Sequence, residues 1–165
     1  MSLLQVYDQY DGDIAKLAGA RSGQYPLPVT GSDDLANSLD RLVAAGSKFD
    51  RVLFTTHGIP GSIYVGGDYI SAAWWRGKMG RKWSRVTTVN AHVYFNGCNV
   101  AEGSDGWDLL DAAAAVFLNP GGGEVFAQTS VGVGLPWNGH SVHFWGKTRK
   151  LYVDYIGRVT ERFEQ

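Results

Sequence analysis

The chain is organised around the stretch Val93-Tyr94-Phe95-Asn96-Gly97-Cys98-Asn99-Val100-Ala101-Glu102-Gly103. Its first part, Val93 to Phe95, is a short run of β-branched and aromatic residues, which is typical of a buried strand. Gly97 ends this run, and Ser104-Asp105 can cap a helix that follows it. In open α/β sheets, ligands bind at the carboxyl ends of the strands. Cys98, the only cysteine of the chain, therefore lies where functional residues are expected.

A second stretch ends in the same way. Arg51 to Thr56 form another short apolar strand, which stops at His57-Gly58. A histidine thus ends one predicted strand and a cysteine ends another. This pattern indicates a thiol and its base, brought together across the edge of the sheet.

Strands alternate with helices in the first half of the sequence. Leu3 to Tyr7 are predicted as the first strand, residues 20–31 as a loop rich in Gly, Pro and Ser, and residues 32–46 as a helix with one apolar stripe. This alternation predicts an α/β fold with a mostly parallel central sheet and helices on both faces. The length and the 44% hydrophobic content suit one domain over residues 1–165.

The later elements follow less regular patterns. Ser62 to Ile70 predict a hairpin on the Gly66-Gly67 turn, and Ser71 to Trp83 predict a helix interrupted by glycines. Further on, Ser141 to Trp145 and Lys150 to Tyr155 predict a second hairpin. Residues 159–163 fit either a last strand or a short helix.

Composition narrows the class of protein. The formal net charge of −1 demands neither nucleic acid nor an anionic membrane as a partner. No apolar run approaches the ~18 residues that span a bilayer, and the N-terminus lacks the features of a signal peptide. A cytoplasmic location is the default expectation, although a module cut from a larger secreted protein would look the same. The oligomeric state is left open.

A basic stretch with tryptophans follows the first hairpin. We interpret it as a solvated helix face with the tryptophans in the core, and expect no binding to nucleic acid. The alternative is a surface for a polyanion or an acidic partner. The residues are Arg76, Lys78, Arg81, Lys82 and Arg85, with Trp74, Trp75 and Trp83 among them.

Three aspartates follow the first strand. Asp8, Asp11 and Asp13 are interpreted first as turn and helix-capping residues. The functional alternative is an acidic wall of a substrate pocket.

The two strand ends resemble the His-Gly and Gly-Cys motifs of the caspase-like cysteine peptidases, the clan of caspases, gingipains, legumain and separase. The order of His and Cys is the same, and their separation is close to the spacing of about 50 positions in caspases. The motifs are most similar to bacterial CHAT domains and to a related bacterial domain of unknown function found near the ends of large surface proteins. His57-Gly58-Ile59-Pro60-Gly61 and Gly97-Cys98-Asn99-Val100-Ala101 carry the resemblance, which covers roughly residues 50–130 by motif order. Asn96-Gly97 replaces the Gln-Ala of caspases proper, which argues against caspase-type aspartate specificity.

The resemblance implies a three-layer caspase-like sandwich and a cysteine endopeptidase. Cys98 would be the nucleophile and His57 its base, with a thioester intermediate. The backbone N–H groups of Gly58 and Cys98 would form the oxyanion hole. A third catalytic member is not required in this clan, and the substrate would be a protein or peptide. Relatives that cleave after Arg or Lys place carboxylates beside the cysteine, so the three aspartates imply a basic P1 residue.

Other constructions fit the sequence less well. A tyrosine phosphatase needs Arg six positions after the cysteine, where this chain has Ser104. A hydrolase triad of Cys98 with His140 or His143 lacks the G-x-C-x-G elbow, since position 100 is Val. In a strand, His140 and His143 would face opposite sides and would not bind one metal ion. We therefore expect no metal and no cofactor. The main alternative to the peptidase is an inactive caspase-like module that binds or assembles without turnover.

Overall fold

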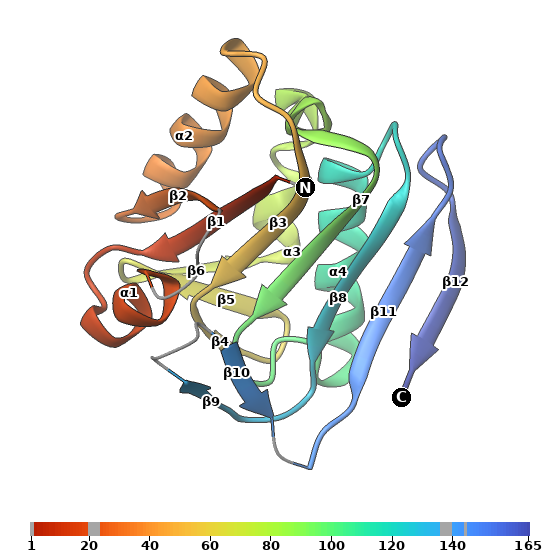
Figure 1. Ribbon diagram of the computed structural model, residues 1–165. Coiled ribbons are helices and arrows are strands. Elements are labelled where there is room, and N and C mark those ends of the chain that lie inside the picture. Colours follow the sequence, from red (N-terminus) through yellow and green to blue (C-terminus); the bar gives the residue numbers. More distant parts are fainter. Residues whose placement is uncertain (1, 20–23, 136–139, 144) are drawn as a thin grey trace.

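The computed structural model describes residues 2–19, 24–135, 140–143 and 145–165, without the side chains of residues 133–144. It shows a mixed α/β fold built on a large, mostly parallel sheet (Figure 1). The helical elements are α1 (Gly12–Gly19), α2 (Ser32–Ala44), α3 (Ala72–Arg76) and α4 (Gly103–Phe117), with 3-10 turns η1 (Met79–Arg81) and η2 (Trp83–Val86). The strands are β1 (Leu3–Asp8), β2 (Gln24–Val29), β3 (Phe49–Thr55), β4 (His57–Ile59), β5 (Ser62–Val65), β6 (Asp68–Ser71), β7 (Thr87–Asn96), β8 (Gly123–Gln128), β9 (Gly132–Leu135), β10 (His140–His143), β11 (Thr148–Val153) and β12 (Val159–Glu164).

The central sheet has the strand order β12-β11-β8-β7-β3-β1-β2. Strands β2, β1, β3, β7 and β8 are parallel, and β11 and β12 add an antiparallel edge. Strands β3 and β7 lie at the centre, so the carboxyl ends that carry His57 and Cys98 are neighbours. The predicted mostly parallel sheet is confirmed.

Helices cover both faces of the sheet. The buried residues of α2, α3 and α4 belong to one core cluster with the sheet residues Val52, Phe54 and Phe95. The buried residues of α1 lie outside that cluster, and α1 packs in front of β1 in Figure 1, opposite α3 and α4. This arrangement follows from right-handed crossovers. The chain moves outward to the edge of the sheet from β1 to β2 and back towards the centre from β2 to β3, so the connecting helices α1 and α2 lie on opposite faces.

One predicted loop is a strand. Residues 24–29, within the stretch predicted as loop, form β2, which pairs with β1 in register. Pro26 and Pro28 obscured this strand in the sequence. An edge strand tolerates proline because half of its N–H groups face away from the sheet.

The C-terminal strands pair differently from the prediction. β10 pairs with β9 in a separate two-stranded sheet, whereas β11 pairs with β8 and β12. The predicted hairpin between residues 141–145 and 150–155 is therefore wrong. The helix predicted over 71–83 ends at Arg76 and continues as the two 3-10 turns, since Gly77 and Gly80 interrupt it. By contrast, the hairpin β5–β6 on Gly66-Gly67 is confirmed, and both glycines have positive φ.

Candidate active site

The sheet brings the two motifs to equal height on neighbouring strands. Thr55 of β3 pairs in register with Asn96 of β7. His57 follows the first of these residues by two positions and Cys98 follows the second by two. Both motifs therefore leave the sheet side by side at its carboxyl edge, as the strand pattern predicted.

The glycines of the two motifs pack against each other. A Cβ atom on Gly58 would come within 2.7 Å of the Cys98 carbonyl oxygen and would overlap the Val100 side chain. A Cβ atom on Gly97 would lie 2.9 Å from Val100 Cγ2 and 3.2 Å from the Thr56 carbonyl oxygen. The missing side chains thus allow the His-Gly and Gly-Cys loops to touch through their backbones. The resemblance gave the Gly58 N–H a role as an oxyanion donor, and the structure adds that the bare Cα of Gly58 accommodates the cysteine loop.

Cys98 lies partly buried between this contact and the segment that follows β8. The Gly132 N–H donates a hydrogen bond to Cys98 Sγ at 3.4 Å, and the Gly132 carbonyl oxygen lies 3.7 Å from Sγ. The Asn99 N–H donates to the Ser130 carbonyl at 3.0 Å, and Asn99 has a left-handed backbone with φ 56°. These contacts hold the turn after the strand. No hydrogen bond joins Cys98 to His57, two residues that the structure describes.

His57 is held from its other side by Asp11. The His57 Nε2 atom lies 2.7 Å from Asp11 Oδ2, and the imidazole is 58% exposed. Asp11 itself caps α1, because its Oδ1 accepts hydrogen bonds from the N–H groups of Asp13 and Ile14. The Ile14 hydrogen bond is the main reason that the pKa of Asp11 lies below its ordinary value, and His57 lowers it further against the opposing effect of burial. The acid–histidine contact leaves Nδ1 as the ring nitrogen not used by Asp11.

No local sequence pattern indicates the contact between Asp11 and His57. The aspartates after β1 were interpreted first as turn and helix-capping residues, which Asp11 is, and alternatively as the wall of a substrate pocket, and no third catalytic member was expected. Seeing the pair requires knowing that the β1–α1 turn lies beside β4. That proximity arises because β1 and β3 are neighbouring parallel strands, so the segments that follow them leave the same edge of the sheet.

The two other aspartates lie in different surroundings. Asp8 is 4% exposed, and its carboxylate accepts hydrogen bonds from the Gly66 N–H at 2.7 Å and the Tyr10 N–H at 3.0 Å. It therefore ties the β5–β6 turn to the end of β1. Asp13 is exposed in the first turn of α1, and its carboxylate has no hydrogen bond to a described residue. The structure thus separates the three carboxylates by role rather than gathering them in one wall.

The expected oxyanion donors lie at the contact between the loops. The Gly58 backbone packs directly on the Cys98 backbone. Within the described part of the chain, no residue accepts a hydrogen bond from the Cys98 N–H.

Three of the five basic side chains of the stretch are neutralised or packed. Arg76 pairs with Asp108 and Arg81 with Asp40, while the Lys78 ammonium lies 5.2 Å above the Trp74 ring. Trp75 and Trp83 are fully buried in the core. This arrangement matches the interpretation of a solvated face over core tryptophans.

Comparison with known proteins identifies the family. A family model described as a domain of unknown function (DUF4347) matches residues 13–129, and the chain belongs to this family. The matched segment contains both His57 and Cys98, whereas Asp8 and Asp11 precede it and β11 and β12 follow it. Neither the curated proteins nor the solved structures gave a match. None of the described helices is long and apolar enough to cross a bilayer.

Proposed function

We propose that this domain is a caspase-like cysteine endopeptidase with Cys98 as nucleophile and His57 as base. The observation that carries the proposal is the contact between the His57-Gly58 and Gly97-Cys98 loops at the carboxyl edge of two adjacent parallel strands. Thiol catalysis requires a base beside the thiol, and the equal height of the two motifs on neighbouring strands supports this pairing. Dyads without a substrate are often looser than a hydrogen bond, and they tighten when the substrate binds.

The reaction has two covalent steps. His57 takes the proton of the Cys98 thiol, and Sγ attacks the peptide carbonyl carbon to form a tetrahedral intermediate. The C–N bond then breaks, His57 gives the proton to the leaving amine, and a thioester remains on Cys98. Water, deprotonated by His57, attacks the thioester and releases the carboxylic acid and the free thiol. The N–H groups of Cys98 and Gly58 would stabilise the oxyanion in each tetrahedral intermediate.

Asp11 would position the base in this mechanism. Its contact with Nε2 fixes the imidazole and favours the tautomer with a proton on Nε2, so that Nδ1 is free to accept the thiol proton. The same carboxylate stabilises the imidazolium that forms during each proton transfer.

Specificity for a basic P1 residue remains a prediction, and the structure changes which residue would provide it. Asp8 is occupied by backbone N–H groups and Asp11 by His57 and α1. Asp13 is the exposed carboxylate of the three. A preference for Arg or Lys would therefore depend on Asp13.

The decisive experiment measures the reactivity of the single thiol. Iodoacetamide alkylation of Cys98 is expected to be fast in the wild type and slower at neutral pH in His57→Ala, because the thiolate is the reacting species. A peptide library scanned at P1 then tests turnover, with Cys98→Ala as the inactive control. Equal alkylation rates in wild type and His57→Ala, together with no cleavage, would support the inactive binding module instead.

A further inference from the structure

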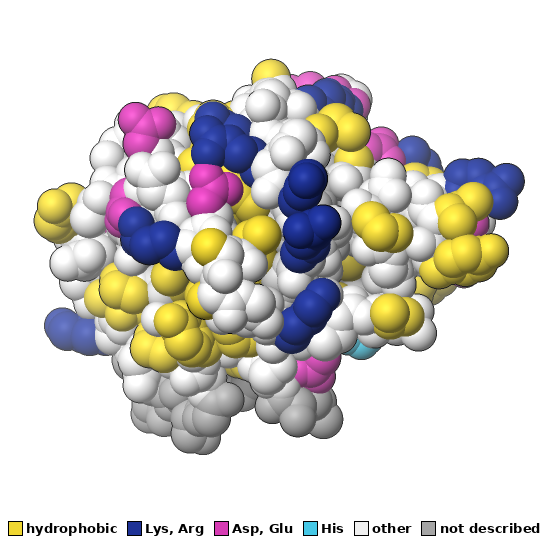
Figure 2. All heavy atoms as spheres, turned by 90° about the horizontal axis from the view of Figure 1, so that it is seen from above, with side chains coloured by type: hydrophobic (Ala, Val, Ile, Leu, Met, Phe, Trp, Pro, Cys, Tyr) yellow, Lys and Arg dark blue, Asp and Glu magenta, His cyan; other side chains and the backbone are white. Residues whose placement is uncertain are grey.

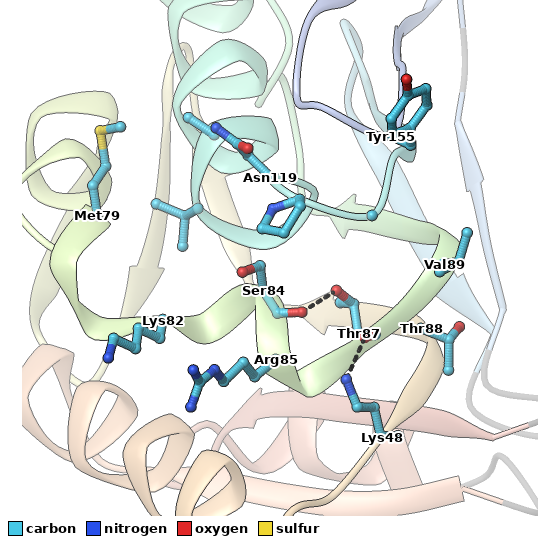
Figure 3. Close-up of a pocket in the computed structure, with 14 residues that line it drawn as sticks. Lys48, Met79, Lys82, Ser84, Arg85, Thr87, Thr88, Val89, Asn119 and Tyr155 are labelled. Atoms are coloured by element: carbon cyan, nitrogen blue, oxygen red, sulfur yellow. Dashed lines mark hydrogen bonds between the residues drawn. The ribbon is translucent and has the colours of Figure 1, made fainter.

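A pocket of about 650 Å³ lies at the opposite edge of the sheet from Cys98. It is formed by the start of β7, the turn η2 and the residues that follow α4, as Figure 3 shows. The function proposed for the carboxyl edge does not use this pocket. Because it lies at the amino ends of the strands, the pocket is separate from the candidate active site at their carboxyl ends.

Three cations line the pocket, and its lining contains no Asp or Glu. The cations are Lys48, Lys82 and Arg85. Within the described residues, Lys82 and Arg85 form no ion pair, whereas their neighbours Arg76 and Arg81 each pair with an aspartate. Figure 2 views this edge of the molecule and shows Lys and Arg side chains in a row across its middle. The local field favours an anion.

The backbone at Lys82 adds a second observation. Lys82 adopts a left-handed conformation, with φ 62° and ψ 32°, at the junction between η1 and η2. Glycine occupies this conformation without the steric cost that a Cβ imposes. A lysine at this position has a positive charge but also a backbone strain that glycine would not have. Such strained residues are common at binding sites.

The pocket also exposes apolar surface. Met79, Val89 and Tyr155 line it, and 54%, 69% and 74% of their surfaces respectively are accessible. In Figure 3, Tyr155 lies across the pocket from Lys82 and Arg85. The pocket thus offers positive charge on one side and an aromatic ring on the other, and it is much larger than one inorganic ion requires.

We propose that this pocket binds a small organic phosphate. The phosphate group would lie among Lys48, Lys82 and Arg85, and the apolar or aromatic part of the ligand would pack against Tyr155. Three cations match the charge of a phosphate monoester better than that of a single carboxylate, and a guanidinium suits phosphate oxygens. A long polyanion is disfavoured because the remaining basic side chains of the stretch already have partners, so no extended positive track exists.

Calorimetric titration of the Cys98→Ala protein tests this proposal with phenyl phosphate, inorganic phosphate and benzoate as probes. Phenyl phosphate is expected to bind most tightly, because only it uses both sides of the pocket. Lys82→Gly and Arg85→Gln are each expected to weaken its binding about tenfold, the effect of losing one charge-assisted hydrogen bond. Cys98→Ala keeps the pocket intact, so failure of the peptidase proposal would not affect this result.

Two controls keep the result decisive. Lys78→Gln removes the same charge from the same stretch but does not line the pocket, so its affinity for phenyl phosphate is expected to equal that of the parent. Lys82→Gly removes the left-handed strain and is expected to preserve the melting temperature.

Three outcomes overturn the proposal: equal affinity of Lys82→Gly and the parent, equal binding of benzoate and phenyl phosphate, or retention on heparin without phenyl phosphate binding. A lower melting temperature in Lys82→Gly without any phosphate binding would also overturn the proposal and would give Lys82 a structural role.

Discussion

Gly58 determines how closely the histidine and cysteine loops approach each other. Its Cα faces the Cys98 carbonyl and the Val100 side chain without room for a methyl group. Gly58→Ala is expected to lower the free energy of unfolding by about 1–3 kcal/mol, the usual cost of overpacking. Urea unfolding measures this change. Gly80→Ala is the matched control, since a Cβ there meets nothing within 4 Å, and equal stability of the two variants would show that the loops separate easily.

The Asp11 carboxylate links the candidate site to pH. Its pKa in the folded protein is lowered, chiefly by the Ile14 N–H and then by His57. The ionised form therefore stabilises the fold above the unfolded-state pKa of about 3.9, and this stabilisation is lost as the pH falls through the folded-state pKa. The difference in unfolding free energy between wild type and Asp11→Asn is expected to be larger at pH 6 than at about pH 3.

Urea unfolding at the two pH values measures this difference. Asp13→Asn is the matched control, because the exposed Asp13 carboxylate has no hydrogen bond to a described residue. The idea fails if Asp11→Asn and wild type differ by the same amount at both pH values.

At the scale of elements, the sequence predicted those strands and helices that are determined by their own residue pattern. β3 and β7 are runs of β-branched and aromatic residues, and α2 has a single apolar stripe, so each was recognisable alone. β2 was missed because Pro26 and Pro28 are more typical of a loop than of a strand. The predicted partner of β11 was wrong because strand pairing depends on segments that are distant in the sequence. The same limit applies to the site. His57 and Cys98 follow adjacent strands and were predicted together, whereas the Asp11 and Gly132 contacts depend on tertiary packing.

Two buried tryptophans near α3 provide a matched comparison. Trp75 and Trp83 are both fully buried beside Phe117, but only Trp83 donates a hydrogen bond from Nε1, to Asp40 at 2.8 Å. Trp75 Nε1 is buried and has no hydrogen-bond partner in the described residues. Trp83→Phe is therefore expected to cost about 1 kcal/mol more unfolding free energy than Trp75→Phe. Denaturant unfolding of both variants tests this, and a larger loss in Trp75→Phe would contradict it.

At the scale of the molecule, the C-terminal strands reach back to the cysteine loop. Arg149 of β11 donates from Nη1 to the carbonyl oxygens of Ala101, at 2.7 Å, and Gly103. Its Nε atom pairs with Glu164 of β12 at 2.6 Å, and its guanidinium lies 5.0 Å from the centre of the Trp107 ring. Both strands lie beyond the segment matched by the family model. The antiparallel edge therefore supports the turn that positions Cys98.

Arg149→Lys tests this support, because it keeps the charge but loses the planar fork that reaches two carbonyl groups at once. Residues 98–103 are expected to exchange their amide hydrogens about tenfold faster, which corresponds to about 1.4 kcal/mol of lost local stability. Hydrogen exchange followed by mass spectrometry of peptides covering this turn measures the change. Arg158→Lys is the control, since Arg158 is highly exposed and pairs only with Asp154 among the described residues. Unchanged exchange at 98–103 in Arg149→Lys, with faster exchange confined to β11 and β12, would show that the cysteine turn is held by β7 and α4 alone.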